Sequence, residues 1–207
     1  MLIKSVEFAG AVAAPHGPKP AALPEIAFSG KSNVGKSSLI NRLLGRTRTP
    51  VARVSATPGK TQEINFYRVR AAAETGADAS FFLVDLPGYG FARVPAEVRA
   101  KWKPLIESYL GGSSELRGIV QLLDARHGPT PDDLRMVRYL ANLGLPTLFV
   151  LTKVDKLSRR ERPKQIEKLI EELGVDADQT LPFSARSGEG REELVASVEA
   201  LLTTERT

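Results

Sequence analysis

Short apolar runs recur along most of the chain and alternate with stretches of helical periodicity. The runs lie at residues 26–28, 81–84, 118–123, 146–151 and 180–183. Amphipathic helices are predicted at residues 39–44, 96–110, 132–142, 160–173 and 189–202. Buried parallel strands read as continuous apolar runs, and their crossover connections are usually helices. The pattern therefore predicts an α/β fold with an open, mostly parallel sheet and helices on both faces.

Alternating apolar and polar positions mark two further strands. Residues 2–8 alternate, and so do residues 64–69, which are followed by a predicted turn at 71–79 and the apolar run at 81–84. The second stretch and the run after that turn predict a hairpin, and hence one antiparallel strand. Four prolines between residues 15 and 24 prevent regular structure there. We expect an N-terminal extension at 1–24, a single domain at 25–203 and a tail at 204–207.

Composition narrows the class of protein. The chain has 207 residues, no cysteine and a formal net charge of +5. Without cysteine, disulfides, thiolate metal sites and thiol nucleophiles are excluded. No apolar run approaches the length of a membrane span, and the N-terminal apolar segment is too weak for a secretory signal, so we expect a cytoplasmic protein. The positive charge favours a polyanionic partner.

Residues 30–38 fit the phosphate-binding pattern G-x-x-x-x-G-K-[ST] between a predicted strand and a predicted helix. This P-loop comprises Gly30, Lys31, Ser32, Asn33, Val34, Gly35, Lys36, Ser37 and Ser38. Glycines let backbone N–H groups converge on phosphate oxygens, and the helix N-terminus adds partial positive charge. Lys36 is expected to reach the outer phosphates, and the Ser37 hydroxyl is expected to bind Mg²⁺.

A D-x-x-G stretch follows the apolar run at 81–84. It comprises Asp85, Leu86, Pro87 and Gly88. Asp85 would lie at the carboxyl end of a strand, where open α/β sheets bind their ligands. Its carboxylate is expected to hold Mg²⁺ through water, while the Gly88 N–H approaches a γ-phosphate.

The run at 146–151 leads into a T-K-x-D stretch typical of guanine recognition. It comprises Thr152, Lys153, Val154 and Asp155. Guanine presents two N–H donors on one edge, so one carboxylate accepts both, whereas adenine would leave Asp155 unmatched. The stem of Lys153 is expected to pack on the ring. After the run at 180–183, a backbone N–H of Ser184 or Ala185 is expected to donate to guanine O6, with the Ser184 side chain bracing the loop.

With these stretches in order, the sequence resembles the EngB family of bacterial ribosome-biogenesis GTPases, a branch of the translation-factor class of P-loop GTPases. The most specific matches are T-P-G-K-T-Q at 57–62 and D-L-P-G-Y-G at 85–90. The resemblance implies a three-layer, Ras-like domain that binds GTP and GDP with Mg²⁺, held by Ser37, Thr61 and Asp85. It also implies nucleotide contacts by Gly59, Lys60, Thr61 and Gln62, a monomeric state, the large ribosomal subunit precursor as partner, and roles in cell division and septation.

The sequence identifies the residues that catalyse hydrolysis less specifically than those that bind the nucleotide. Lys36, Thr61 and Asn33 are the candidates. Many GTPases orient the attacking water with a Gln after the D-x-x-G glycine, but Tyr89 stands at that position here, so slow turnover is expected. A partner that supplies the missing catalytic group can raise the rate of GTP hydrolysis by a factor of about 10³ to 10⁵. Similar potassium-dependent GTPases carry Asn at the position of Asn33, which makes K⁺ an alternative cofactor.

Two other functions stay open at this point. One is a guanine-nucleotide-binding module with negligible hydrolysis, which the tyrosine at position 89 favours. The other is a phosphotransferase acting on a small metabolite, although the chain has no spare segment for an arginine-rich lid. Hydrolysis assays with and without ribosomal particles separate the three.

Overall fold

Seven strands and five α-helices build the molecule in the computed structural model, which describes residues 1–52, 63–72, 76, 78–90 and 96–203, with the side chains of 96–102 excepted. The strands are β1 (Leu2–Val12), β2 (Glu25–Gly30), β3 (Ile64–Ala72), β4 (Asp78–Asp85), β5 (Leu116–Asp124), β6 (Thr147–Thr152) and β7 (Thr180–Phe183). The helices are α1 (Lys36–Leu43), α2 (Ala96–Gly112), α3 (Pro131–Asn142), α4 (Arg162–Leu173) and α5 (Arg191–Thr203), with 3-10 turns η1 (Val154–Lys156) and η2 (Ala177–Gln179).

The strands form one sheet in the order β1-β3-β4-β2-β5-β6-β7. Only β3 runs against its neighbours, because it pairs antiparallel with both β1 and β4, whereas every other pairing is parallel. The predicted α/β fold with one antiparallel strand is therefore confirmed. Strand β2 lies between β4 and β5, so the segments that leave the carboxyl ends of these three strands meet at one edge of the sheet.

Two sequence-based boundaries were wrong. The turn expected at 71–79 is shorter, because Ala71 pairs with Ala79 and Ala72 with Asp78, which continues the β3–β4 hairpin. Ala71 is buried in the core, so its packing extends the strand. The first strand continues past Phe8 to Val12, with a register shift between Phe8 and Gly10 that accommodates the interruption in the pattern.

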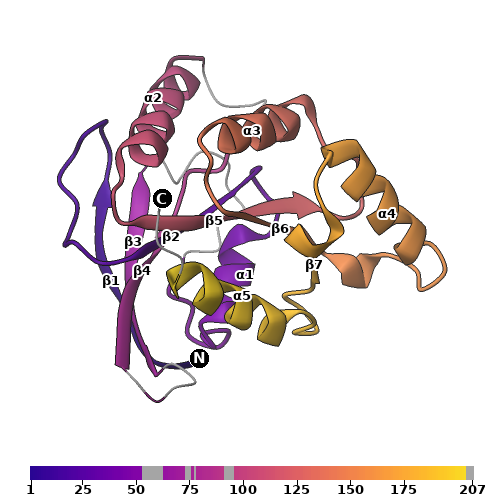
Figure 1. Cartoon of the computed structure of the whole chain (residues 1–207), viewed down its shortest axis with the longest axis horizontal. Coiled ribbons are helices and arrows are strands. Elements are labelled where there is room, and N and C mark those ends of the chain that lie inside the picture. The colour runs from indigo at the N-terminus through magenta and orange to yellow at the C-terminus, as the bar shows by residue number, and fades with distance from the viewer. Residues whose placement is uncertain (53–62, 73–75, 77, 91–95, 204–207) are drawn as a thin grey trace.

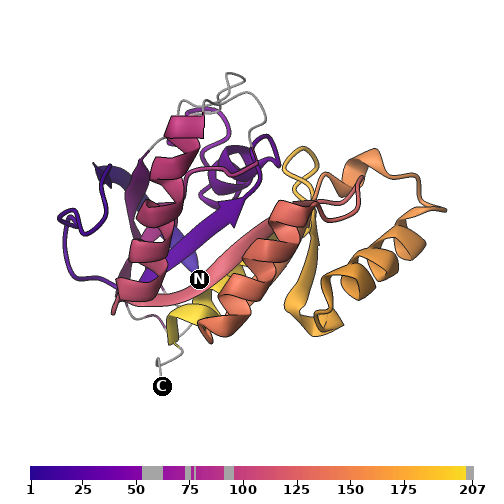
Figure 2. The same cartoon turned by 90° about the horizontal axis from the view of Figure 1, so that it is seen from above.

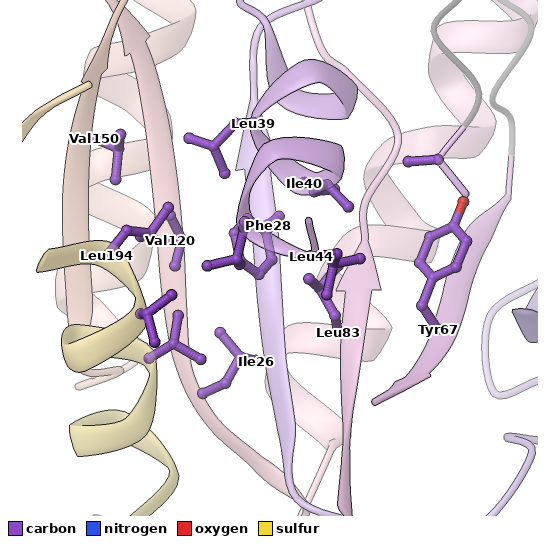
Figure 3. Close-up of a cluster of buried hydrophobic side chains, with 14 of the residues drawn as sticks. Ile26, Phe28, Leu39, Ile40, Leu44, Tyr67, Leu83, Val120, Val150 and Leu194 are labelled. Carbon is purple, nitrogen blue, oxygen red and sulfur yellow. The ribbon is translucent and has the colours of Figure 1, made fainter. Parts of the chain in front are cut away.

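Helices cover both faces of the sheet. Helices α1 and α5 lie on one face, and α2, α3 and α4 lie on the other (Figures 1 and 2). Side chains of β2 alternate between the two cores: Ile26 and Phe28 pack with α1 and α5, whereas Ala27 packs with α2. Figure 3 shows Phe28 next to Leu39 and Ile40 of α1. No described helix is long and apolar enough to cross a membrane.

Lys19 fastens the proline-containing segment that precedes β2. Its Nζ donates to Glu25 Oε1 at 2.8 Å, Ser113 Oγ at 2.9 Å and Glu115 Oε2 at 2.5 Å. Glu25 is fully buried and also accepts hydrogen bonds from Tyr109 and Ser113, so its charge is satisfied from three sides. The expected division between 1–24 and 25–203 stays a prediction, and residues 204–207 lie outside the described residues.

Candidate nucleotide-binding site

The P-loop joins the carboxyl end of β2 to the first turn of α1. Asn33 and Gly35 have positive φ values of 62° and 105°, and Gly35 immediately precedes the helix. A left-handed residue turns the chain sharply, and at φ 105° only glycine is free of strain. No side chain caps this N-terminus, which is fully described, so the N–H groups of the first turn remain available to an anion.

The segment after β4 runs alongside the P-loop. The Ser32 N–H donates to the Tyr89 carbonyl at 2.9 Å, and the Tyr89 N–H donates to the Gly30 carbonyl at 3.3 Å. A Cβ at Gly88 would lie 2.8 Å from Ser32 Oγ and 3.2 Å from Ser32 Cα, so a larger residue would force Ser32 to shift. The two predicted phosphate-binding segments are thus held together by backbone bonds and close contact.

Lys36 and Asp85 form an ion pair where these segments meet. Their side chains are 10% and 6% exposed, so the pair is nearly dry. Asp85 thus already holds one cation, the lysine ammonium, at the place where the sequence predicts Mg²⁺. Ser37 follows Lys36 in the first turn of α1, and a hydroxyl oxygen of this kind suits Mg²⁺.

Protein side chains alone would not hold a metal ion here. In the part of the chain that the structure describes, no three acidic, histidine or cysteine side chains gather as a metal site. Mg²⁺ commonly keeps waters and binds through one or two carboxylates plus substrate phosphates, so one hydroxyl and one carboxylate are a sufficient protein contribution. The residues present therefore fit a Mg²⁺ that arrives with phosphates.

The predicted guanine-reading stretch leaves β6 beside the P-loop. The Thr152 hydroxyl donates to the Val34 carbonyl at 2.7 Å, and Lys153 Nζ donates to the Asn33 carbonyl at 2.6 Å. Asp155 is exposed, and its Oδ1 accepts a hydrogen bond of 2.8 Å from Ser184 Oγ. The structure thus brings together Asp155 and Ser184, which are 29 positions apart, and ties their strands to the phosphate end.

The loop between β7 and α5 is held by its own backbone and by α1. The Ser184 N–H donates to the Glu189 carbonyl at 3.1 Å, so it is occupied, and Ala185 is the better placed of the two expected backbone donors. Arg42 Nε donates to the Ala185 carbonyl at 2.7 Å. Arg42 is a positioning residue to which the sequence assigned no role, because helical spacing does not show which loop a side chain reaches.

Asp124 was missed as part of the site. It ends β5, and its Oδ2 accepts 2.9 Å and 2.7 Å hydrogen bonds from Lys153 and Arg126. Burial raises the pKa of Asp124, but hydrogen bonds from Arg126 and Lys153 outweigh it and hold the pKa well below its usual range. Asp124 therefore stays ionised and fixes Lys153. A polar residue directly after the apolar run 118–123 was the available signal.

Four predicted nucleotide contacts fall outside the described residues. They are Gly59, Lys60, Thr61 and Gln62. Their expected contacts, including that of Thr61 with Mg²⁺, stay predictions. The other predicted site residues gather at the carboxyl ends of β2, β4, β6 and β7, which form one edge of the sheet.

Comparison with known proteins decides the family. Residues 25–153 match a family model described as "50S ribosome-binding GTPase". A protein of Gemmatimonas aurantiaca, named probable GTP-binding protein EngB, is 50% identical over 203 residues, which cover 98% of this chain and 95% of that protein. The chain belongs to the EngB family. It is therefore a P-loop GTPase, as the motifs predicted.

Solved structures agree with the EngB assignment. The crystal structure of a probable GTP-binding protein EngB matches with a TM-score of 0.65 and 25% identity, covering 86% of this chain and 98% of that one. The structure of Era in complex with MgGDPNP and a 16S ribosomal RNA segment matches with a TM-score of 0.65 and 26% identity, covering 89% of this chain and 58% of Era. The Ras-like domain predicted for an EngB protein is thus the observed fold.

Proposed function

We propose that the chain binds GTP and GDP with Mg²⁺ at the P-loop edge of the sheet, hydrolyses GTP slowly, and acts as a GTP-controlled factor in assembly of the large ribosomal subunit. One observation carries the nucleotide assignment. The carboxylate of Asp155 accepts a hydrogen bond from Ser184, and the two residues at the end of β6, Thr152 and the following Lys153, bond directly to P-loop carbonyls. The carboxylate proposed to bind guanine is therefore joined directly to the loop proposed to bind the phosphates.

Each group has a defined task in this proposal. Asp155 accepts the two guanine N–H donors, and Ala185 donates its N–H to O6. Lys36 leaves Asp85 for the phosphates, where its charge stabilises the transition state. Ser37 and Thr61 would hold Mg²⁺ directly, and Asp85 would hold it through water. When bound, Mg²⁺ neutralises the charge that develops on the phosphate oxygens.

Slow turnover is proposed because the water-orienting Gln is replaced by Tyr89. A K⁺ ion bound near the phosphates with the help of Asn33 would supply positive charge in place of an arginine. Asn33 supports this role by its exposure and by its left-handed turn at the tip of the P-loop. The protein is a cytoplasmic monomer in this proposal.

The ribosomal partner rests on two observations. The matching family model carries a ribosome-binding description, and the chain has a formal net charge of +5, which suits a polyanion such as rRNA. A protein that binds RNA phosphates releases counterions from the RNA. Its affinity falls as the salt concentration rises, because the entropy gained by the released ions is then smaller. A steep fall in affinity for the particle with salt would therefore support an RNA contact.

GTP hydrolysis, measured for the protein alone and with large-subunit particles, in K⁺ and in Na⁺, tests the proposal. We expect slow release of phosphate alone and faster release with particles. Equal rates in K⁺ and Na⁺ would refute a role for K⁺. No hydrolysis under any of these conditions would indicate a module that binds guanine nucleotide without hydrolysing it. Phosphate on a small acceptor would instead indicate a phosphotransferase.

A further inference from the structure

The side chain of Tyr89, directly after the D-x-x-G glycine, reaches β5 and the first turn of α3. Its hydroxyl donates to Asp133 Oδ1 at 2.7 Å and accepts a 2.7 Å hydrogen bond from Gln121 Nε2. Gln121 is fully buried in β5, and Asp133 is 6% exposed in the first turn of α3. Burial and the Asp133 carboxylate raise the pKa of Tyr89 far above its ordinary value, so the hydroxyl remains a donor.

Asp133 is itself fixed by a second set of bonds. Its Oδ2 accepts the Thr130 N–H at 2.8 Å and the Thr130 hydroxyl at 2.6 Å, which completes the capping box of α3. A capping residue is held by the helix it begins. The Tyr89 hydroxyl is therefore anchored to two other elements of the fold, β5 and the first turn of α3.

The backbone of Tyr89 is hydrogen-bonded to the P-loop, so the position of its side chain also affects the P-loop. Its carbonyl accepts the Ser32 N–H, and its N–H donates to the Gly30 carbonyl. The preceding Gly88 lies so close to Ser32 that a Cβ there would be 3.2 Å from Ser32 Cα. The Gly88 N–H is the group expected to meet the γ-phosphate. While the hydroxyl is bonded to Gln121 and Asp133, the side chain is held away from the phosphates, yet it fixes the peptide that approaches them.

We propose that Tyr89 is a positioning residue: the Gln121–Tyr89–Asp133 bridge holds the Gly88 peptide in place for the γ-phosphate and links GTP binding to the first turn of α3. The inference rests on the proposed function, since it needs a guanine nucleotide at this site. GDP lacks the phosphate that Gly88 meets. Loss of the bridge therefore weakens GTP binding and leaves GDP binding nearly unchanged.

The experiment compares affinities for GDP and for a non-hydrolysable GTP analogue, with Mg²⁺, in the wild type and in Tyr89→Phe. Tyr89→Phe removes both hydrogen bonds of the hydroxyl. With the peptide less ordered, we expect about a 3- to 10-fold weaker affinity for the analogue and less than about a 2-fold change for GDP. Tyr139→Phe, which removes a hydroxyl further along α3, is the matched control and should change neither affinity.

Gln121→Leu provides a second variant, which removes one partner and keeps Tyr89 itself. It should lower the ratio of analogue to GDP affinity in the same direction. Equal weakening of both nucleotides in both variants, or no change in either, would overturn the positioning role while wild-type binding keeps the proposed function. If the wild type binds neither nucleotide, the proposed function fails and this inference fails with it.

Discussion

The ammonium group of Lys36 and the carboxylate of Asp85 pair across the junction of the P-loop and the end of β4, both almost shielded from solvent. A buried pair costs desolvation of both ions, so its contribution is felt mainly when one partner is removed. The pair joins the lysine proposed to bind the phosphates to the carboxylate proposed to hold Mg²⁺. Each of these two charges is thus neutralised by the other. In the proposed function, nucleotide binding separates them.

Removing either partner should destabilise the nucleotide-free protein. Lys36→Met or Asp85→Asn leaves one buried group unmatched, with an expected loss of about 3 to 5 kcal/mol in the free energy of unfolding. The double variant should lose clearly less than both single losses combined. Urea denaturation without nucleotide measures this. Lys4→Met, which breaks an exposed pair with Asp78, should cost no more than about 1 kcal/mol, and additive losses at Lys36 and Asp85 would refute the pair.

Asp124 should make the stability of the folded protein depend on pH in the acid range. Its pKa in the folded protein is below the value of about 3.9 expected for an unfolded chain, so the folded state favours the ionised form. The resulting stability is present above pH about 4 and is lost as the pH falls toward the folded pKa. Asp124→Asn should lose about 1 to 3 kcal/mol at pH 7 and show a flatter acid dependence. Exposed Asp178→Asn should retain the wild-type profile in urea melts at several pH values.

Lys19 should account for much of the attachment of the N-terminal segment. The Lys19 hydrogen bond is the main cause that lowers the pKa of Glu115 to about 2 from an ordinary value of 4.5. Stability from this group is present above pH about 4.5 and is lost as pH falls toward 2. Lys19→Met also leaves Glu25 buried without its cation, with an expected cost of about 3 to 5 kcal/mol.

Thermal and urea unfolding from pH 2 to 7 check this expectation. Lys168→Met, at an exposed lysine of α4, is the control and should stay within about 1 kcal/mol of the wild type. A Lys19→Met protein as stable as the control, with an unchanged acid profile, would show that the segment is held by packing alone.

The sequence predicted the sheet because its central strands are buried on both faces and leave continuous apolar runs. The P-loop was predictable because its chemistry needs fixed residue types at fixed spacing. The length of the β3–β4 hairpin was not, because alanines such as Ala71 carry little periodic signal and only packing shows that the strand continues.

Contacts between polar residues far apart in the chain were the part that could not be predicted. Lys19 meets Glu115, and Tyr89 meets Asp133, across sequence separations of 96 and 44 positions. Hydrophobic periodicity places elements but does not say which polar side chains meet between them. The same holds for Asp124 and Lys153, which were each visible at a strand end but not as a pair.

The central claim is that Asp155 makes this P-loop site selective for guanine, and the binding of GDP, ADP and xanthosine diphosphate to the wild type and to Asp155→Asn tests it most directly. We expect the wild type to bind GDP and to discriminate against the other two. The variant should lose at least about tenfold in GDP affinity and gain for xanthosine diphosphate, because the amide can donate to the C2 oxygen. GDP affinity unchanged in Asp155→Asn would contradict the account.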